Sequence, residues 1–118
     1  MRITFIQMPV FESAWRRMRL SDVDLSALEA EIAKDPEAPP LMRGTGGVRK
    51  IRFAPPSWQR GKSGATRVCY AYFARFAQVY LFLIFSKDKK GNVTAFEAKT
   101  LHGLMKRIEQ LLDERGVA

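Results

Sequence analysis

Three segments of the chain carry apolar residues at helical spacing with charged residues mostly on the opposite face. This pattern predicts amphipathic helices over residues 10–18, 25–32 and 101–112. Ser26 followed by Glu29 forms a capping-box pattern near the start of the second helix, where Asp24 is an alternative cap. Thr94 with Glu97 forms the same pattern before the third. Two helices are therefore expected in the first third of the chain and one at its C-terminal end.

Four further segments have the composition of strands: residues 2–8, 48–54, 66–74 and 78–86. In the second of these, Ile51 and Phe53 alternate with Lys50 and Arg52, so the two cations should share one face. The last two are separated by a short turn and should form a hairpin, with the final strand central because it is apolar on both faces. The order of the elements predicts an α+β fold, an antiparallel sheet on which two N-terminal helices and a C-terminal helix pack.

Length and composition narrow the class of protein. A chain of 118 residues is expected to be a single domain, 1–118, and 47% hydrophobic residues suffice for a core. One cysteine, Cys69, and one histidine, His102, exclude an internal disulfide and a Cys/His zinc scaffold. The longest apolar runs have seven residues, and the N-terminus lacks the pattern of a signal peptide. A cytoplasmic protein without membrane contact is expected.

The positive charge is concentrated in the middle of the chain. Residues 43–90 contain eleven Lys and Arg against one Asp, a net charge of +10, whereas the rest of the chain carries −2. Such a focused field favours a polyanionic partner, either nucleic acid or an acidic protein. The alternative is a solvated basic surface that serves solubility.

The sequence does not satisfy three common enzyme motifs that parts of it resemble. Residues 60–63, RGKS, imitate the end of a nucleotide-binding P-loop, but Pro56 stands where the motif needs its first glycine. Arg49 occupies the third glycine position of a dinucleotide-binding fingerprint. A hydrolase triad built on Ser57, Ser63 or Cys69 would depend entirely on His102. No nucleotide cofactor and no hydrolase triad are expected.

The remaining candidate chemistry is a group of cations on neighbouring strands. Lys50 and Arg52 share a strand face, Arg67 lies on the next strand, and three lysines follow the last strand: Lys87, Lys89 and Lys90. Strands about 4.8 Å apart would bring these side chains to one patch. Arginines bind phosphate bidentately, and like charges held together favour the neutral form of a lysine, which makes Lys50 a candidate proton acceptor. The patch is suited to binding RNA phosphate and stabilising a cleavage transition state, unless these cations simply face water.

Two spaced motifs resemble a known family. Residues 44–52, GTGGVRKIR, and residues 61–70, GKSGATRVCY, followed by the apolar strand into residues 85–87, resemble toxins of the RelE/ParE superfamily of bacterial type II toxin–antitoxin modules, closest to the HigB-like branch. The resemblance covers Met1 to about Leu112. It implies a RelE-like fold similar to microbial ribonucleases, entry into the ribosomal A site and cleavage of the bound messenger without metal or other cofactor.

The resemblance also implies roles for individual residues. The catalytic positions would be Lys50, Arg52, Arg67 and Lys87. RNA contacts are expected from the other basic and aromatic residues nearby: Arg49, Trp58, Arg60, Lys62, Tyr70, Lys89 and Lys90. The chain departs from the RelE pattern in having Asp88 after Lys87 and no tyrosine after Tyr80. The general base is therefore left open among Lys89, Lys90 and Tyr70.

The implied partners are a cognate antitoxin with a helix-turn-helix domain, the ribosome with its messenger, and operator DNA only through the antitoxin. An acidic antitoxin segment would cover the basic sheet face, or else the antitoxin would dock on the apolar stripe of the first or last helix. A ParE-like inhibitor of DNA gyrase that does not cleave RNA is the main alternative function. An inactive fold that only binds antitoxin and DNA is a third possibility.

Overall fold

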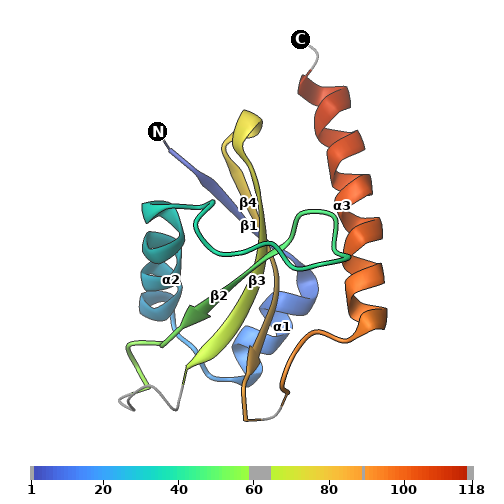
Figure 1. The fold of residues 1–118 in the computed structure, drawn as a ribbon. Coiled ribbons are helices and arrows are strands. Elements are labelled where there is room, and N and C mark those ends of the chain that lie inside the picture. Colours follow the sequence, from blue (N-terminus) through green and yellow to red (C-terminus); the bar gives the residue numbers. More distant parts are fainter. Residues whose placement is uncertain (1, 59–64, 89, 117–118) are drawn as a thin grey trace.

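The computed structural model describes residues 2–58, 65–88 and 90–116 of the chain. Its elements, in chain order, are β1 (Thr4–Gln7), α1 (Pro9–Arg17), α2 (Asp22–Lys34), β2 (Arg49–Phe53), β3 (Thr66–Phe73), a short 3-10 turn η2 (Ala74–Phe76), β4 (Gln78–Ser86) and α3 (Ala95–Gly116). The strands form one sheet in the order β1-β4-β3-β2 (Figure 1). The predicted α+β class, the hairpin and the central position of its second strand are confirmed.

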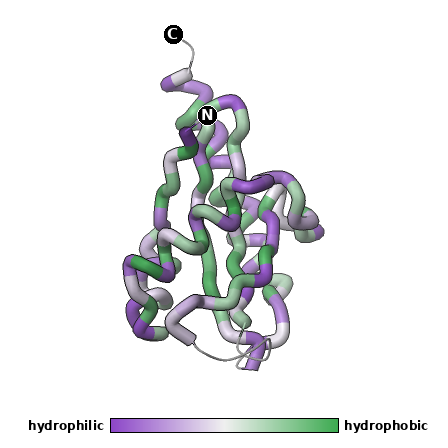
Figure 2. Tube along the Cα trace, turned by 90° about the vertical axis from the view of Figure 1, so that its left-hand side faces the viewer, coloured by the Kyte–Doolittle hydropathy of each residue, from purple (hydrophilic) through white to green (hydrophobic). Residues whose placement is uncertain are grey.

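The sheet separates two hydrophobic layers. Helices α1 and α2 cover one face, where Phe11, Trp15, Leu28 and Ile32 pack on alternate residues of β3 and β4. Helix α3 covers part of the other face through Leu101, Met105, Ile108 and Leu112 (Figure 1). Hydrophobic positions accordingly run along the central strands in Figure 2. The apolar stripes of the three helices are thus the surfaces that bury the sheet.

One edge of the sheet differs from the antiparallel arrangement that was predicted. Strand β1 runs parallel to β4, with Thr4 opposite Gln78 and Gln7 opposite Leu81. The other two strand pairs are antiparallel. A strand of four residues has no pattern that reports the direction of its neighbour, and so the sequence could not indicate this pairing.

A β-bulge sets which side chains of β4 face each layer. The register shifts from Cys69 opposite Leu83 to Tyr70 opposite Leu81, which leaves Phe82 as an extra residue. As a result Leu81 packs in the α1/α2 layer, whereas Phe82 packs in the α3 layer. Because of the bulge, the consecutive residues Phe82 and Leu83 both pack in the α3 layer, and alternation then continues with Ile84 in the α1/α2 layer.

The helix starts agree with prediction at α3 and disagree at α2. Thr94 and Glu97 form the predicted capping box, with each backbone N–H donating to the other's side chain. Helix α2 instead begins after Ser21, whose hydroxyl accepts from the N–H of Asp24. The prediction of a cap at Ser26 is therefore wrong, because that residue lies inside the helix. None of the helices in the described ranges is long and apolar enough to cross a bilayer.

Candidate nucleic-acid interface

Three cations lie on the sheet face that α3 only partly covers. Ile51 packs toward the α1/α2 layer, so the alternating Lys50 and Arg52 lie on the opposite face of β2, as predicted. Arg52 is the register partner of Arg67, and Lys50 that of buried Cys69. Arg52 is exposed, whereas Lys50 and Arg67 are half-buried. Lys50, Arg52 and Arg67 are called the basic face below.

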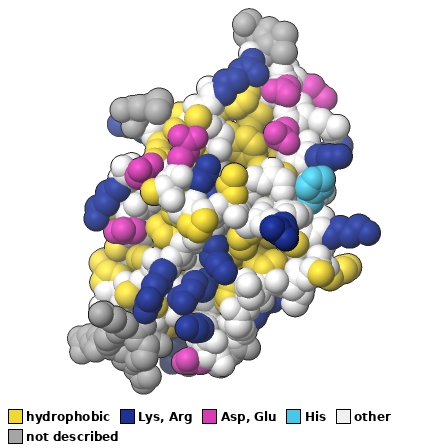
Figure 3. Space-filling view, viewed as in Figure 1, with side chains coloured by type: hydrophobic (Ala, Val, Ile, Leu, Met, Phe, Trp, Pro, Cys, Tyr) yellow, Lys and Arg dark blue, Asp and Glu magenta, His cyan; other side chains and the backbone are white. Residues whose placement is uncertain are grey.

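Two lysines extend the basic face past the end of β4. Lys87 is exposed and directly follows Ser86, which is paired with Thr66. Lys90 lies 5.8 Å from the centre of the Phe85 ring, and Phe85 is the register partner of Arg67. Figure 3 shows Lys and Arg side chains gathered over this part of the molecule. The structure therefore brings five of the predicted cations to one side of the sheet.

Lys90 is a poor candidate for proton transfer to RNA, because its ammonium group is bound by a carboxylate. Its ammonium group forms an ion pair with Glu97, the carboxylate that also accepts from the N–H of Thr94. Burial would raise the pKa of Glu97, but the hydrogen bonds from Lys90 and Thr94 outweigh it and hold that pKa below the ordinary value. Glu97 thus stays charged and holds the ammonium group of Lys90 beside Phe85.

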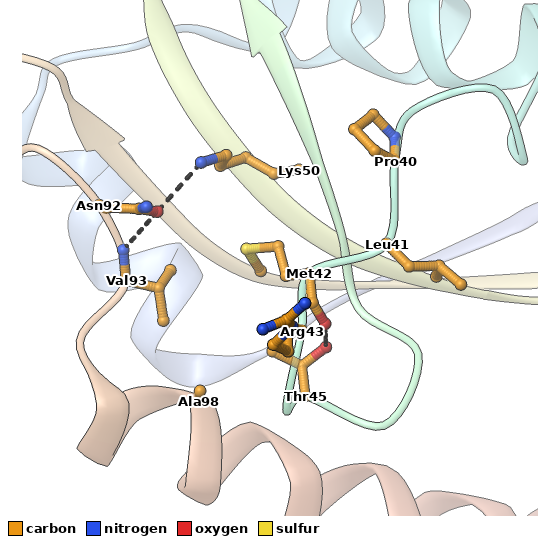
Figure 4. A pocket seen from close by; sticks show the side chains of 9 residues that line it. All are labelled: Pro40, Leu41, Met42, Arg43, Thr45, Lys50, Asn92, Val93 and Ala98. Atoms are coloured by element: carbon orange, nitrogen blue, oxygen red, sulfur yellow. Dashed lines mark hydrogen bonds between the residues drawn. The ribbon is translucent and has the colours of Figure 1, made fainter.

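Lys50 forms a hydrogen bond with a residue that is distant in the sequence. Its Nζ donates to Oδ1 of Asn92 at 3.0 Å, which ties β2 to the segment that leads into α3. Both residues line a pocket of about 360 Å³, called the Lys50 pocket below (Figure 4). The rest of its lining comes from the loop before β2, from Val93 and from the first turn of α3: Pro40, Leu41, Met42, Arg43, Thr45 and Ala98.

The glycine-rich motif before β2 builds one wall of this pocket. The Oγ1 of buried Thr45 donates to the carbonyl of Met42 at 2.7 Å and accepts from the N–H of Val48 at 3.0 Å. Gly46 has φ of +78°, and a Cβ there would lie 2.8 Å from Cδ2 of His102 on α3. The loop can approach α3 this closely only because the residue has no side chain.

Three residues predicted to contact RNA lie elsewhere. Arg49 points away from the basic face and donates to the carbonyls of Glu37 and Pro39, each at 2.7 Å. Trp58 packs against the α1/α2 layer. Tyr70 is fully buried there and donates to the carbonyl of Pro36 at 2.7 Å. Tyr70 has no exposed surface, which corrects its assignment as an RNA contact, whereas Arg49 and Trp58 are half-buried and lie outside the basic face.

Burial makes two side chains unsuited to proton transfer or nucleophilic attack, those of Tyr70 and Cys69. Burial raises the pKa of Tyr70 to about 12, so its hydroxyl is unsuited to accept a proton. Burial likewise raises the pKa of Cys69 to about 12, although the positive charges of Lys50 and Lys90 oppose this shift. Among the residues that the structure describes, no three His, Cys, Asp or Glu side chains are grouped to hold a metal ion. Arg60, Lys62 and Lys89 lie outside the described residues.

A second surface was not singled out from the sequence. An apolar groove of about 400 Å³ runs between the start of α1 and the first half of α3, lined mainly by hydrophobic residues that include Val10, Phe82, Phe96 and Leu104. Phe96 is 78% exposed and Val10 61% exposed. The signal was present in the sequence, since Phe96 precedes the apolar stripe of the predicted helix and lies off it.

Comparison with known proteins supports the fold. No protein-family model matches the chain. A solved structure of the E. coli toxin RelE, a double arginine-to-alanine mutant in the free state, superposes with a TM-score of 0.52 and 18% sequence identity over 77% of this chain and 90% of that chain. The chain therefore has a RelE-like fold. The identity is low enough that the comparison bears on architecture alone.

Proposed function

We propose that this protein is the toxin of a type II toxin–antitoxin module, related to the HigB-like branch, and that it cleaves messenger RNA bound to the ribosome. The observation that carries the proposal is the pairing of Arg52 with Arg67, beside Lys50, on an accessible sheet face of a RelE-like fold. Two guanidinium groups and an ammonium group at one place are suited to a phosphodiester and to the extra charge of its transition state.

The proposed reaction is an internal displacement at phosphorus. The 2′-oxygen of the RNA loses its proton and bonds to the adjacent phosphorus, the bond from phosphorus to the 5′-oxygen breaks, and a proton passes to that oxygen. The products are a 2′,3′-cyclic phosphate and a free 5′-hydroxyl. Arg52 and Arg67 would stabilise the non-bridging oxygens, with Lys87 at the end of the strand as a further cation.

Proton transfer is assigned to Lys50. Tyr70 is buried and Lys90 is paired with Glu97, and Lys50 is the lysine of the basic face, two residues from Arg52 on the same strand. Lys50 would exchange its hydrogen bond to Asn92 for one to the RNA. A site without a strong acid–base pair depends on positioning, which the ribosome would supply in the cytoplasm. Free RNA should therefore be a poor substrate.

The decisive experiment compares two targets of RelE/ParE-type toxins. Purified protein is incubated with ribosomes translating a defined message, with the same message free, and with DNA gyrase and relaxed plasmid. We expect cuts in the ribosome-bound message, few in free RNA, and normal supercoiling. Intact messages together with inhibited supercoiling would overturn the proposal in favour of the gyrase inhibitor.

The proposed module includes an antitoxin with an acidic segment that covers the basic face and a helix-turn-helix domain for operator DNA. Direct coverage of Lys50 and Arg67 predicts binding that weakens steeply from about 50 to 500 mM salt. Docking in the apolar groove beside Phe96 predicts little change with salt. A flat salt profile with unaltered affinity for Lys50→Ala and Arg67→Ala would contradict coverage of the basic face.

A further inference from the structure

The Lys50 pocket has the mixed lining of a site for one nucleotide. Its volume of about 360 Å³ falls within the range of about 300–1,000 Å³ that small-molecule sites occupy. Leu41, Met42 and Val93 provide apolar surface for the faces of a ring, and Arg43 and Lys50 bring positive charge. In Figure 4, Lys50 and Asn92 lie on one side of the pocket, and Arg43 and Thr45 on the other. A flat base with a charged phosphate matches this combination.

The pocket is also correctly placed for a nucleotide beside the proposed cleavage site. Lys50 belongs both to the pocket and to the basic face. Arg52 follows on the same strand face, about 7 Å farther along. A phosphate bound by Arg52 and Arg67 therefore has its neighbouring nucleotide within reach of the pocket. The apolar groove beside Phe96 lacks such cations and does not share this property.

Asn92 provides a group that can distinguish bases. Its Oδ1 accepts from Nζ of Lys50 at 3.0 Å and from the N–H of Val93 at 2.8 Å, and these two donors fix the orientation of the amide. Contact with a ligand by this side chain therefore falls to Nδ2, a donor of hydrogen bonds. A donor at the base edge favours guanine and uracil, which present keto oxygens, over adenine and cytosine, which present amino groups at the same positions.

We propose that the Lys50 pocket binds the nucleobase next to the scissile phosphate, and that Nδ2 of Asn92 selects keto bases at that position. This inference deepens the proposed function and rests on it for the role of the bound base, although the binding itself does not depend on catalysis. Arg43 covers the base with its planar guanidinium group, and the N–H of Val93 keeps Asn92 oriented after Lys50 turns to the RNA phosphate.

The test uses the four ribonucleoside 5′-monophosphates as probes, with NMR of the full chain. We expect GMP and UMP to shift the resonances of Asn92 and of residues 41–45, and to bind about fivefold more tightly than AMP and CMP, the value of one hydrogen bond. Asn92→Asp keeps the oxygen that faces Lys50 and Val93 but exchanges the donor for an acceptor. This variant should reverse the preference toward AMP and CMP.

The matched control is Gln110→Glu, the same change from amide to carboxylate at an exposed residue of α3 outside the pocket. It should keep the preference of the unmodified chain. Thermal unfolding of both variants checks that each folds. Absence of shifts at Asn92, or equal binding of all four nucleotides by both Asn92 forms, would overturn the inference.

Mapping of cut sites in ribosome-bound messages separates this inference from the proposed function. Keto bases should be enriched beside the cut for the unmodified chain, and amino bases for Asn92→Asp. Cleavage with the same base distribution in both forms would leave the nuclease standing and refute the pocket. Nucleotide binding with the expected preference, but no cleavage on ribosomes, would support the pocket and refute the nuclease.

Discussion

Arg52 and Arg67 are register partners on neighbouring antiparallel strands, on the same face of the sheet. Directly opposite residues have Cβ atoms only about 5 Å apart, and like charges in this position destabilise a sheet. A phosphate that contacts both guanidinium groups would offset this repulsion. For this reason the pair supports the functional proposal.

Replacement of Arg67 separates function from folding. Arg67→Ala should reduce cleavage of ribosome-bound messages by more than about tenfold, because one of two groups that stabilise the transition state is lost. Its free energy of unfolding should stay within about 1 kcal/mol of the unmodified chain, since the change also relieves repulsion with Arg52. The control is Arg75→Ala, which removes an exposed ion pair with Asp113 and a contact with the Phe76 ring, both away from the basic face. Equal loss of activity in both variants would contradict the assignment.

Gly46 provides a test of how the loop before β2 meets α3. Gly46→Ala and Gly44→Ala face the same backbone cost, because both glycines have φ of +78°. Only at Gly46 would the new Cβ lie within 3 Å of another atom, Cδ2 of His102, whereas nothing lies within 4 Å at Gly44. Urea unfolding should therefore show a larger loss for Gly46→Ala.

The double-mutant cycle with His102→Ala isolates this contact. His102 is exposed, so its removal alone should change stability by less than about 0.5 kcal/mol. In the His102→Ala background, Gly46→Ala should cost no more than Gly44→Ala. A persistent difference between the two glycines would show that the loop does not pack on α3 as described.

Strand alternation in the sequence predicts which residues of β2 form the basic face. It does not predict the residues from other segments that surround this face. The sequence placed Lys50 with Arg52 because Ile51 and Phe53 alternate with them, and the structure confirms this. The same rule assigns Arg49 to the other face, where its guanidinium group donates to the carbonyls of Glu37 and Pro39.

Other features required the tertiary structure. The contact between Lys50 and Asn92 joins residues 42 positions apart, and no local pattern relates a loop to a strand at that separation. The burial of Tyr70 depends on α2 and on Pro36, two residues after the end of that helix, whose carbonyl accepts from the Tyr70 hydroxyl. Short-range periodicity predicts faces, but it does not predict which distant segment covers them.

The capping box of α3 includes Glu97, which also pairs with Lys90. A single substitution in the box measures how much this helix cap contributes to the stability of the protein. Thr94→Ala should lower the free energy of unfolding by about 1 kcal/mol, because the Thr94 hydroxyl accepts from the N–H of Glu97. Thr100→Ala is the control, since that exposed threonine only donates to the carbonyl of Phe96 in the preceding turn. Equal effects of the two substitutions in chemical denaturation would contradict the cap.

Asp24 should make stability depend on pH in the acid range. Its buried carboxylate accepts from the N–H and hydroxyl groups of Ser21 and Ser57, which ties the start of α2 to the segment after β2. Burial would raise the pKa of Asp24, but these hydrogen bonds together lower it below its ordinary value of 3.8. A depressed pKa in the folded state contributes stability that is present above 3.8 and lost as the pH falls through the folded value.

Asp24→Asn measures this contribution directly. At pH 7 the variant should be less stable by about 1–3 kcal/mol, because a buried charged acceptor with four donors is replaced by a neutral amide. The difference between the two proteins should shrink as the pH falls below 3.8, where the unfolded chain begins to bind a proton at Asp24. Asp22→Asn, an exposed residue in the same helical turn, should lose little at pH 7, since it gives up only a favourable charge near the helix start. A gap between Asp24→Asn and the unmodified chain that stays constant from pH 7 to pH 2 would show that the Asp24 charge does not hold the two segments together.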